Sequence, residues 1–197
     1  MKPILLLLAF VIALTNSSII RKAGKAKATT VLSSKAMTDT ARQPAVQLFE
    51  TRVDSMCLVV IRDTARNAAE LNARLGKAYG ELYTFINQNN LVPGKPMAFY
   101  YTSRWPFIFE AAVQTDKLAW RTKGRVKINR LPAGNAVVAK YKGPYGQISI
   151  AYTAITGWLA AHHKTPVGFP FEVYISDPQL VKDTFELRTD VYQLLKE

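Results

Sequence analysis

A carboxylate within an apolar and aromatic segment is the residue of this chain best suited to chemistry. It is Glu172, in residues 168–178, which read Gly-Phe-Pro-Phe-Glu-Val-Tyr-Ile-Ser-Asp-Pro. Alternate side chains of a strand share a face, so Tyr174 lies on the face of Glu172. Phe171 and Val173 share the other face. Because burying an unpartnered carboxylate is costly and raises its pKa, Glu172 is solvated, paired with a basic residue, or available to a ligand.

Several aromatic residues are candidates to surround this carboxylate. If Phe171, Val173 and Ile175 pack on helices, Glu172 and Tyr174 face a cleft on the opposite side of the sheet. Aromatic faces and a desolvated carboxylate together suit planar or amphipathic cations. The candidate ligand-binding set is Glu172, Tyr174, Tyr145, Tyr100, Trp105 and Phe107. Ordinary packing, or a loop covering the cleft, is an open alternative for Tyr100, Trp105 and Phe107.

A catalytic interpretation needs Glu172 alone. A carboxyl with a raised pKa can act as a general acid or base. We expect Cys57 to be a small buried residue, His162 and His163 to cap a helix end, and Trp158 to belong to the core. With two histidines and one cysteine, neither a metal site nor a cofactor is expected. We therefore assign no catalytic residue, except Glu172 if the protein is an enzyme.

The elements that position these residues fall into two similar halves, at about residues 52–116 and 124–195. The first half predicts a strand over 53–61, a helix and strands over 97–102 and 107–115. The helical face comprises Ala68, Leu71, Leu75, Ala78, Tyr79, Leu82, Phe85 and Ile86. The second half predicts a strand over 135–141, a helix that begins at Pro144, and strands over 171–176 and 184–192.

Short segments of the two halves also match each other. Residues 94–100 parallel 168–174, residues 78–80 parallel 144–146, and residues 109–110 parallel 185–186. This pattern indicates an internal duplication of a strand-helix-strand-strand unit. Ala98 then occupies the position equivalent to Glu172. Since the duplicated position does without an acid, the fold does not require one there, which favours a functional role for Glu172.

An ordered set of motifs resembles the GyrI-like small-molecule-binding domain, which is also the effector-binding domain of AraC- and MerR-type multidrug-sensing regulators. The set comprises Gly143-Pro144-Tyr145, the helix after it, Gly168-x-Pro170-x-Glu172-x-Tyr174, and a last strand over 185–192. The resemblance implies an α+β fold of two repeated strand-helix-strand-strand units with antiparallel sheets, helices on one side and a ligand cleft on the other. It also implies an acid at the position of Glu172 for multidrug binding.

Two further activities follow from the resemblance. Some relatives look like hydrolases that open strained rings with an acid in the cleft, and one branch of the family binds DNA gyrase. An exported protein could not meet gyrase, and the 50 residues before the domain leave no room for a helix-turn-helix, so we disfavour a gyrase inhibitor and a transcriptional regulator.

The amino terminus indicates export or membrane anchoring. Residues 1–20 join a basic start to an apolar run that is short for a membrane span, as in a signal peptide. Residues 21–45 predict a flexible basic tether, and residues 46–197 the ligand-binding domain. If the run stays uncleaved, the cations beyond it favour a cytoplasmic carboxyl side, so the side of the membrane is open.

Composition and charge fit a single packed domain with a basic surface. The chain has 197 residues, 49% of them hydrophobic, and a net charge of +12. Residues 117–142 hold eight basic residues and no acid. This run can attract an anionic partner or form a solvated edge, and no nucleic-acid motif accompanies it. We expect a protein that binds small amphipathic or aromatic molecules, cations among them, without transforming them, with hydrolysis of strained-ring or xenobiotic molecules as the alternative.

Overall fold

The computed structural model describes residues 42–197. The expected signal or anchor at 1–20, and residues 21–41 of the expected tether, lie outside that range. Arg42, which belongs to the last residues of the expected tether, forms ion pairs with Asp183 and Glu186. No helix between residues 42 and 197 is long and apolar enough to cross a membrane.

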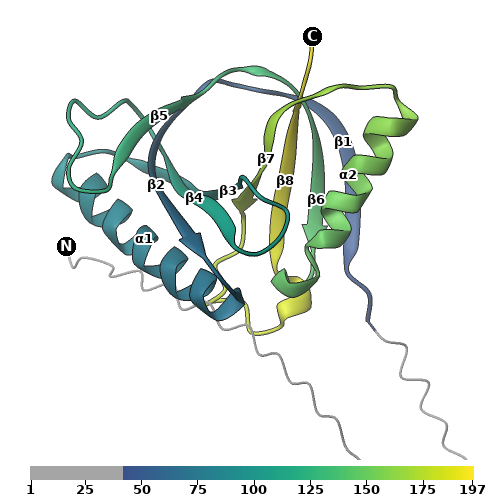
Figure 1. Cartoon of the computed structure of the whole chain (residues 1–197), viewed down its shortest axis with the longest axis horizontal. Helices are drawn as coiled ribbons and strands as arrows, with labels where there is room; N and C mark the ends of the chain where they lie inside the picture. Colours follow the sequence, from purple (N-terminus) through teal and green to yellow (C-terminus); the bar gives the residue numbers. More distant parts are fainter. Residues whose placement is uncertain (1–41) are drawn as a thin grey trace, which may run out of the picture.

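Residues 42–197 form eight strands and two α-helices, which Figure 1 shows with α1 and α2 on either side of the central strands. In chain order the elements are β1 (Ala45–Val53), β2 (Met56–Ala65), α1 (Ala68–Gln88), β3 (Pro93–Tyr100), β4 (Phe107–Thr115), β5 (Lys127–Leu131), β6 (Gly134–Lys142), α2 (Ser149–Ala161), β7 (Pro166–Tyr174) and β8 (Arg188–Leu195). Short 3-10 turns precede α2 and β8, at Tyr145–Gln147 and Thr184–Glu186.

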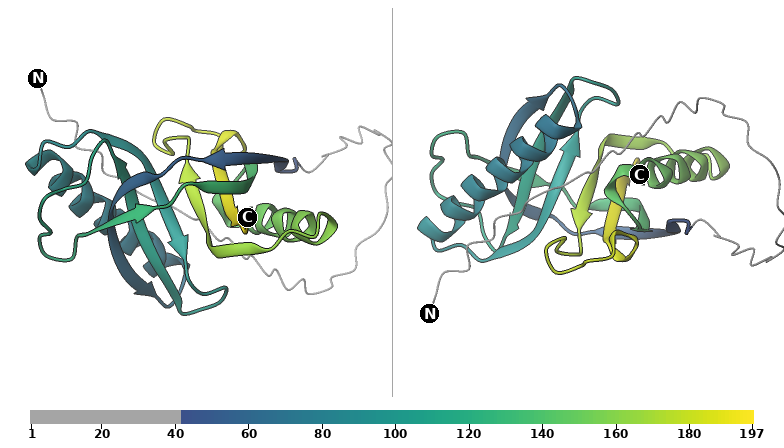
Figure 2. Two further views of the ribbon diagram at one scale, coloured as in Figure 1. Left: turned by 90° about the horizontal axis from the view of Figure 1, so that it is seen from above. Right: turned by 90° about the horizontal axis from the view of Figure 1, so that it is seen from below.

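All strand pairs are antiparallel, and the sheet order is β1-β6-β8-β7-β3-β4-β2-β5. The order is symmetric about its centre: counted inward from the two edges, β1 corresponds to β5, β6 to β2, β8 to β4 and β7 to β3. The two units join through β3 and β7, where Ala98 pairs with Glu172, and lie side by side in Figure 2. The expected α+β class, with an antiparallel sheet and two strand-helix-strand-strand units, is confirmed.

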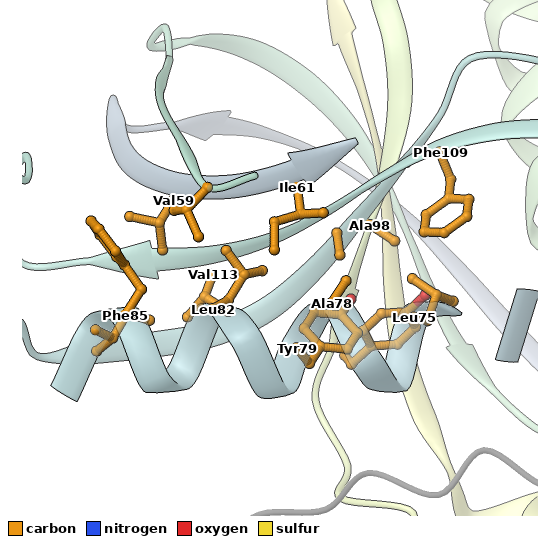
Figure 3. Packing of buried hydrophobic residues seen from close by; sticks show 14 of the residues in the cluster. Val59, Ile61, Leu75, Ala78, Tyr79, Leu82, Phe85, Ala98, Phe109 and Val113 are labelled. Carbon is orange, nitrogen blue, oxygen red and sulfur yellow. The ribbon is translucent and has the colours of Figure 1, made fainter. Parts of the chain in front are cut away.

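One face of the sheet is covered by both helices. Because directly paired residues share a face, Ile61, Ala111, Ala98, Glu172, Val191 and Ala139 form a single row across six strands. At one end of the row Ile61 packs beneath α1 with Leu75, Ala78, Tyr79 and Leu82 (Figure 3). At the other end Ala139 and Val191 pack beneath Ala151 and Ile155 of α2. The apolar spacing predicted for α1 is thus confirmed.

The other face of the sheet curls around an apolar cluster. Val53 at the end of β1 and Leu131 at the end of β5, from opposite edges of the sheet, belong to one apolar cluster with Phe171 and Val173. The sheet therefore curls, which brings the ends of its two edge strands together over this cluster. Apolar burial at about 25 cal/mol per Å² makes this curvature favourable.

Two details of the expected arrangement were wrong. Phe171 and Val173 pack inside the curl rather than on the helices, so the cleft does not lie on the side away from the helices. It lies on the helix-covered face, because α1 and α2 sit over different halves of the sheet and leave its centre open. Glu172 and Tyr174 still face the cleft, as their shared parity predicted.

The internal sequence matches are only partly structural. Residues 109–110 lie in β4, but residues 185–186 lie in the 3-10 turn before β8. Tyr79 lies in the middle of α1, whereas Tyr145 lies in the turn before α2. Ala98 and Glu172 are direct cross-strand partners, so the equivalence of 94–100 with 168–174 agrees with the sheet. The edge strands β1 and β5 were not predicted.

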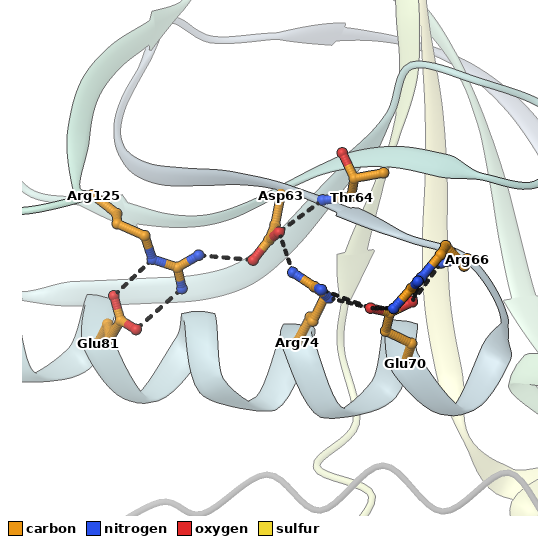
Figure 4. Close-up of polar contacts among 7 residues, drawn as sticks. All are labelled: Asp63, Thr64, Arg66, Glu70, Arg74, Glu81 and Arg125. Carbon is orange, nitrogen blue, oxygen red and sulfur yellow. Dashed lines mark hydrogen bonds and ion pairs between the residues drawn. The ribbon is translucent and has the colours of Figure 1, made fainter.

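An ion-pair network fastens α1 to the sheet and to the loop before β5 (Figure 4). Asp63 of β2 accepts from Arg74 at 2.8 Å and from Arg125 at 2.7 Å, and Arg125 also pairs with Glu81. The Arg74 and Arg125 guanidinium groups lower the pKa of Asp63 against the opposing effect of burial. The side chain of Asn67 caps the helix by accepting from the Glu70 amide.

Candidate functional site

A cavity of about 650 Å³ lies between the first turns of the two helices, above the β3–β7 junction. Its floor comes from Tyr100, Glu172 and Tyr174, and its walls from Leu71 and Leu75 of α1 and Ile148 and Tyr152 at the start of α2. Trp105, Phe107, Tyr145 and Phe169 complete an aromatic lining. None of the described residues that line the cavity is basic.

Among the described residues of this lining Glu172 is the one acid, and it is 4% exposed. Tyr152 donates a hydrogen bond to its Oε1 at 2.8 Å, and Tyr174 donates to its Oε2 at 2.7 Å. Burial raises the pKa of Glu172 to about 7, against the opposing effect of these two hydrogen bonds. The carboxyl is thus poised to hold or release a proton near neutral pH.

The tyrosines around Glu172 act as donors at every physiological pH. Burial raises the pKa values of Tyr152 and Tyr174 well above the usual range for a phenol, and the Glu172 charge raises them further. The Tyr174 hydroxyl uses its one hydrogen to donate to Glu172. In the 3.4 Å contact between the two phenols, Tyr100 is therefore the donor and Tyr174 the acceptor. Glu172 therefore ends a chain of hydroxyl groups that runs across the β3–β7 junction.

The backbone around the site explains why these side chains converge. Ala98 lies opposite Glu172, and its small side chain leaves the space above the junction open. Tyr145 reaches the cavity from the turn after Gly143, where Tyr141 donates to the Pro144 carbonyl at 2.7 Å. A Cβ at Gly143 would lie 2.7 Å from the Tyr141 hydroxyl and 2.8 Å from Cβ of Pro44, so this turn requires glycine.

Aromatic rings meet mainly edge to face in this cavity. The ring of Tyr174 lies 5.8 Å from that of Tyr145 and 6.5 Å from that of Tyr79, both nearly perpendicular. The ring centroids of Trp105 and Phe107 lie 4.0 Å apart, and the two ring planes are inclined by 33°. Trp105 is 42% exposed, so part of the rim is open to a ligand.

The structure brings all six predicted site residues to one cavity. Glu172, Tyr174, Tyr100, Tyr145, Trp105 and Phe107 all line it. Sequence reasoning missed Tyr152, Tyr101 and Phe169, which also line the cavity. Tyr152 follows Tyr145 by seven residues, which is about two helical turns. This spacing from an expected site residue was the signal that could have identified it.

The other candidate residues lie away from this cavity. Cys57 of β2 is partly exposed rather than buried. His162 ends α2, where its Nδ1 contacts the Trp158 carbonyl at 2.9 Å and its ring stacks on that of Trp158. Trp158 is half-buried against the α2 cluster. Residues 42–197 contain no cluster of three or more potential metal ligands.

The fold and the cavity define a domain built to enclose a small molecule. The family model of the GyrI-like small-molecule-binding domain matches residues 58–196, and the chain belongs to this family. A comparison with curated proteins gave no match.

Solved structures of similar fold agree with this assignment. The crystal structure of the EcmrR C-terminal domain has a TM-score of 0.66 and 17% identity, covering 77% of this chain and 98% of that one. EcmrR in its complex with DNA has a TM-score of 0.69 and 16% identity over 77% of this chain, which spans 58% of the length of that EcmrR chain.

Two further structures differ in what their names describe. A hydrolase from Listeria innocua has a TM-score of 0.58 and 12% identity, covering 76% of this chain and 92% of that one. SAV2435 bound to tetraphenylphosphonium has a TM-score of 0.50 and 11% identity, covering 76% of this chain and 94% of that one. At these identities the likeness concerns the fold.

Proposed function

We propose that the cavity binds amphipathic aromatic cations and that the Glu172 carboxylate provides the opposing charge. The observation that carries the proposal is a buried carboxylate held by two tyrosine hydroxyls, in a cavity whose described lining contains no basic residue. Hydroxyl donors offset part of the cost of burying that charge but do not neutralise it. A cationic ligand supplies the missing charge.

The size and walls of the cavity suit a drug-sized aromatic molecule. Its volume of about 650 Å³ lies within the roughly 300–1,000 Å³ typical of small-molecule sites. Ring faces attract positive charge, so Tyr145, Trp105 and Phe107 add to the attraction of Glu172. SAV2435, which shares the fold, is seen with tetraphenylphosphonium, a bulky aromatic cation. That ligand is therefore a suitable first probe.

A pair of ligands of equal shape and opposite charge tests the proposal. Calorimetric titration compares tetraphenylphosphonium with tetraphenylborate, for the parent and for Glu172→Gln. An ion pair about 5 Å apart at an effective dielectric of about 20 contributes roughly 3 kcal/mol, or about 100-fold in affinity. We expect the parent to prefer the cation by at least this factor, and Glu172→Gln to lose that preference.

Glu50→Gln is the matched control. Glu50 is exposed and pairs with Lys164 outside the cavity, so its replacement removes the same charge without touching the site. It should leave both affinities unchanged. If Glu172→Gln binds the cation as tightly as the parent does, the carboxylate is not the anchor and the proposal is wrong.

A second candidate function, hydrolysis of strained-ring or xenobiotic molecules, is favoured by the Glu172 pKa of about 7. A carboxyl with that pKa can protonate a leaving oxygen and then activate water. A Listeria innocua structure of this fold is described as a hydrolase. Turnover of an epoxide such as styrene oxide, lost in Glu172→Gln, supports this function. Saturable binding of the epoxide without any product would exclude hydrolysis and support binding as the only function of the cavity.

A further inference from the structure

A second surface feature lies at the end of the molecule where α1 ends, away from the cavity. The loop of residues 116–126 joins β4 to β5 beyond the last turn of α1 (Figure 1). Trp120 in this loop is 97% exposed, although tryptophan is highly buried in most proteins. Leu118 and Val92 are also exposed large apolar residues. The cavity uses none of these side chains.

The loop holds Trp120 outward by fixed contacts. Ala119 and Val126 are buried in the α1 cluster on either side of it. Asp116 and Val92 exchange two hydrogen bonds, through the Asp116 amide at 3.2 Å and its Oδ1 at 2.8 Å. Lys123 and Val126 close a turn in which Gly124 has a φ of +59°. The Trp120 ring is presented to solvent by a fastened loop.

Cations lie close to Trp120 in the sequence of this loop. Lys117, Arg121 and Lys123 are exposed and have no ion-pair partner in the described chain. Lys123 donates to the neutral Gln88 side chain at 3.4 Å, at the end of α1. Arg125 is different, because Asp63 and Glu81 neutralise it (Figure 4). Asp116 is the single acid of the loop.

We propose that this loop docks on an anionic phospholipid surface, with Trp120 in the headgroup region and Lys117, Arg121 and Lys123 on lipid phosphates. Tryptophan concentrates at membrane interfaces because its ring is apolar and its N–H is polar. Basic residues beside it are attracted to anionic headgroups. Leu118 and Val92 favour lipid over nucleic acid, since exposed aliphatic side chains add nothing to binding a phosphate backbone.

Vesicle binding by the full chain tests this docking surface. The probes are unilamellar vesicles of phosphatidylcholine alone, and of phosphatidylcholine with phosphatidylglycerol in equal parts. We expect tighter binding to the anionic vesicles and a blue shift of tryptophan emission that Trp120→Phe removes. Combined Lys117→Gln, Arg121→Gln and Lys123→Gln should weaken anionic binding about 100-fold, because each cation contributes roughly a factor of five.

A control with the same net charge separates the loop from the overall basic charge. Lys77, Lys182 and Arg188 are exposed cations elsewhere on the surface. Replacing all three with glutamine should leave most of the anionic binding intact. Equal binding to both vesicle types, equal loss in both triple variants, or an emission shift that survives Trp120→Phe would each overturn the proposal. Tighter loop-dependent binding to duplex or single-stranded DNA than to anionic vesicles would overturn it too.

Discussion

At Glu172 a buried carboxyl makes the stability of the protein depend on pH in an unusual direction. Its pKa is about 7 in the folded protein and 4.5 for the ordinary side chain. Between these values the folded state holds a proton that the unfolded state has released. The contribution of Glu172 to stability is therefore fully present at pH values below its ordinary pKa, and it is lost as the pH rises through the pKa of the folded protein. A paired carboxylate with a lowered pKa, such as Asp63, has the opposite effect.

Glu172→Gln should abolish this particular loss of stability. We expect the free energy of unfolding of the parent to drop by an amount on the order of 3 kcal/mol, relative to the variant, between about pH 5 and pH 8. Urea denaturation at several pH values measures both proteins, and their difference cancels other groups, such as Asp190. A difference that does not change with pH would show that the carboxyl has an ordinary pKa in the folded protein.

Tyr152 tunes the same carboxyl from α2. Its hydroxyl donates to the Glu172 carboxylate, so removing it should raise the pKa of Glu172 further. Tyr152→Phe is expected to weaken tetraphenylphosphonium binding near neutral pH about three- to tenfold, while binding near pH 9 recovers. A plot of affinity against pH should show the midpoint shifted upward. Loss of affinity at every pH would instead mean that Tyr152 contacts the ligand or shapes the cavity.

Among the elements, the turn between β6 and α2 has the strictest steric requirement. Gly143 packs against Tyr141 and Pro44, leaving no room for a Cβ. Gly143→Ala should destabilise the fold by about 1–3 kcal/mol, because overpacking forces neighbouring groups to move. Gly157→Ala in α2 is the control, since a Cβ there meets nothing within 4 Å. It should stabilise slightly, by up to about 1 kcal/mol. Thermal unfolding of the two variants distinguishes these outcomes, and equal transition temperatures would contradict the steric argument.

How far the sequence predicts each element depends on whether local pattern decides its structure. The apolar spacing from Leu75 to Ile86 predicts α1, and strand alternation places Tyr174 beside Glu172, because both are local properties. The face on which the cleft opens is a tertiary property that depends on where α1 and α2 rest. The edge strands β1 and β5 were missed because charged residues such as Glu50 and Lys127 resemble a tether or a loop, although edge strands commonly carry charge.

The candidate site shows the same division. Glu172, Tyr174 and Tyr100 were predicted from alternation on two strands that the internal duplication places in matching positions. Tyr152 was missed because its helical position indicates packing equally well, and only the tertiary fold brings its hydroxyl to within 2.8 Å of Glu172. The exposed Trp120 could not be predicted at all, since burial of a loop residue has no periodic signal.

At the scale of the whole molecule, the two halves share their apolar clusters. β3 and β7 pair directly over three residue pairs, which is a narrow hydrogen-bonded connection. Tyr174 of the second half packs into the α1 cluster, and Phe171 and Val173 pack with residues from both edges of the curled sheet. Neither half can therefore unfold without exposing apolar surface of the other.

This shared burial predicts that the described domain unfolds as one cooperative unit. Leu82→Ala beneath α1 and Ile155→Ala beneath α2 should each cost about 2–5 kcal/mol. Each should lower the protection of amides in β2 and in β6 by the same amount, because both strands open only in global unfolding. Native-state hydrogen exchange measures this for every strand. If Ile155→Ala loosened β6 and β8 while β2 kept its full protection, the halves would be separate units, and the cavity would lie at a mobile boundary rather than within one rigid body.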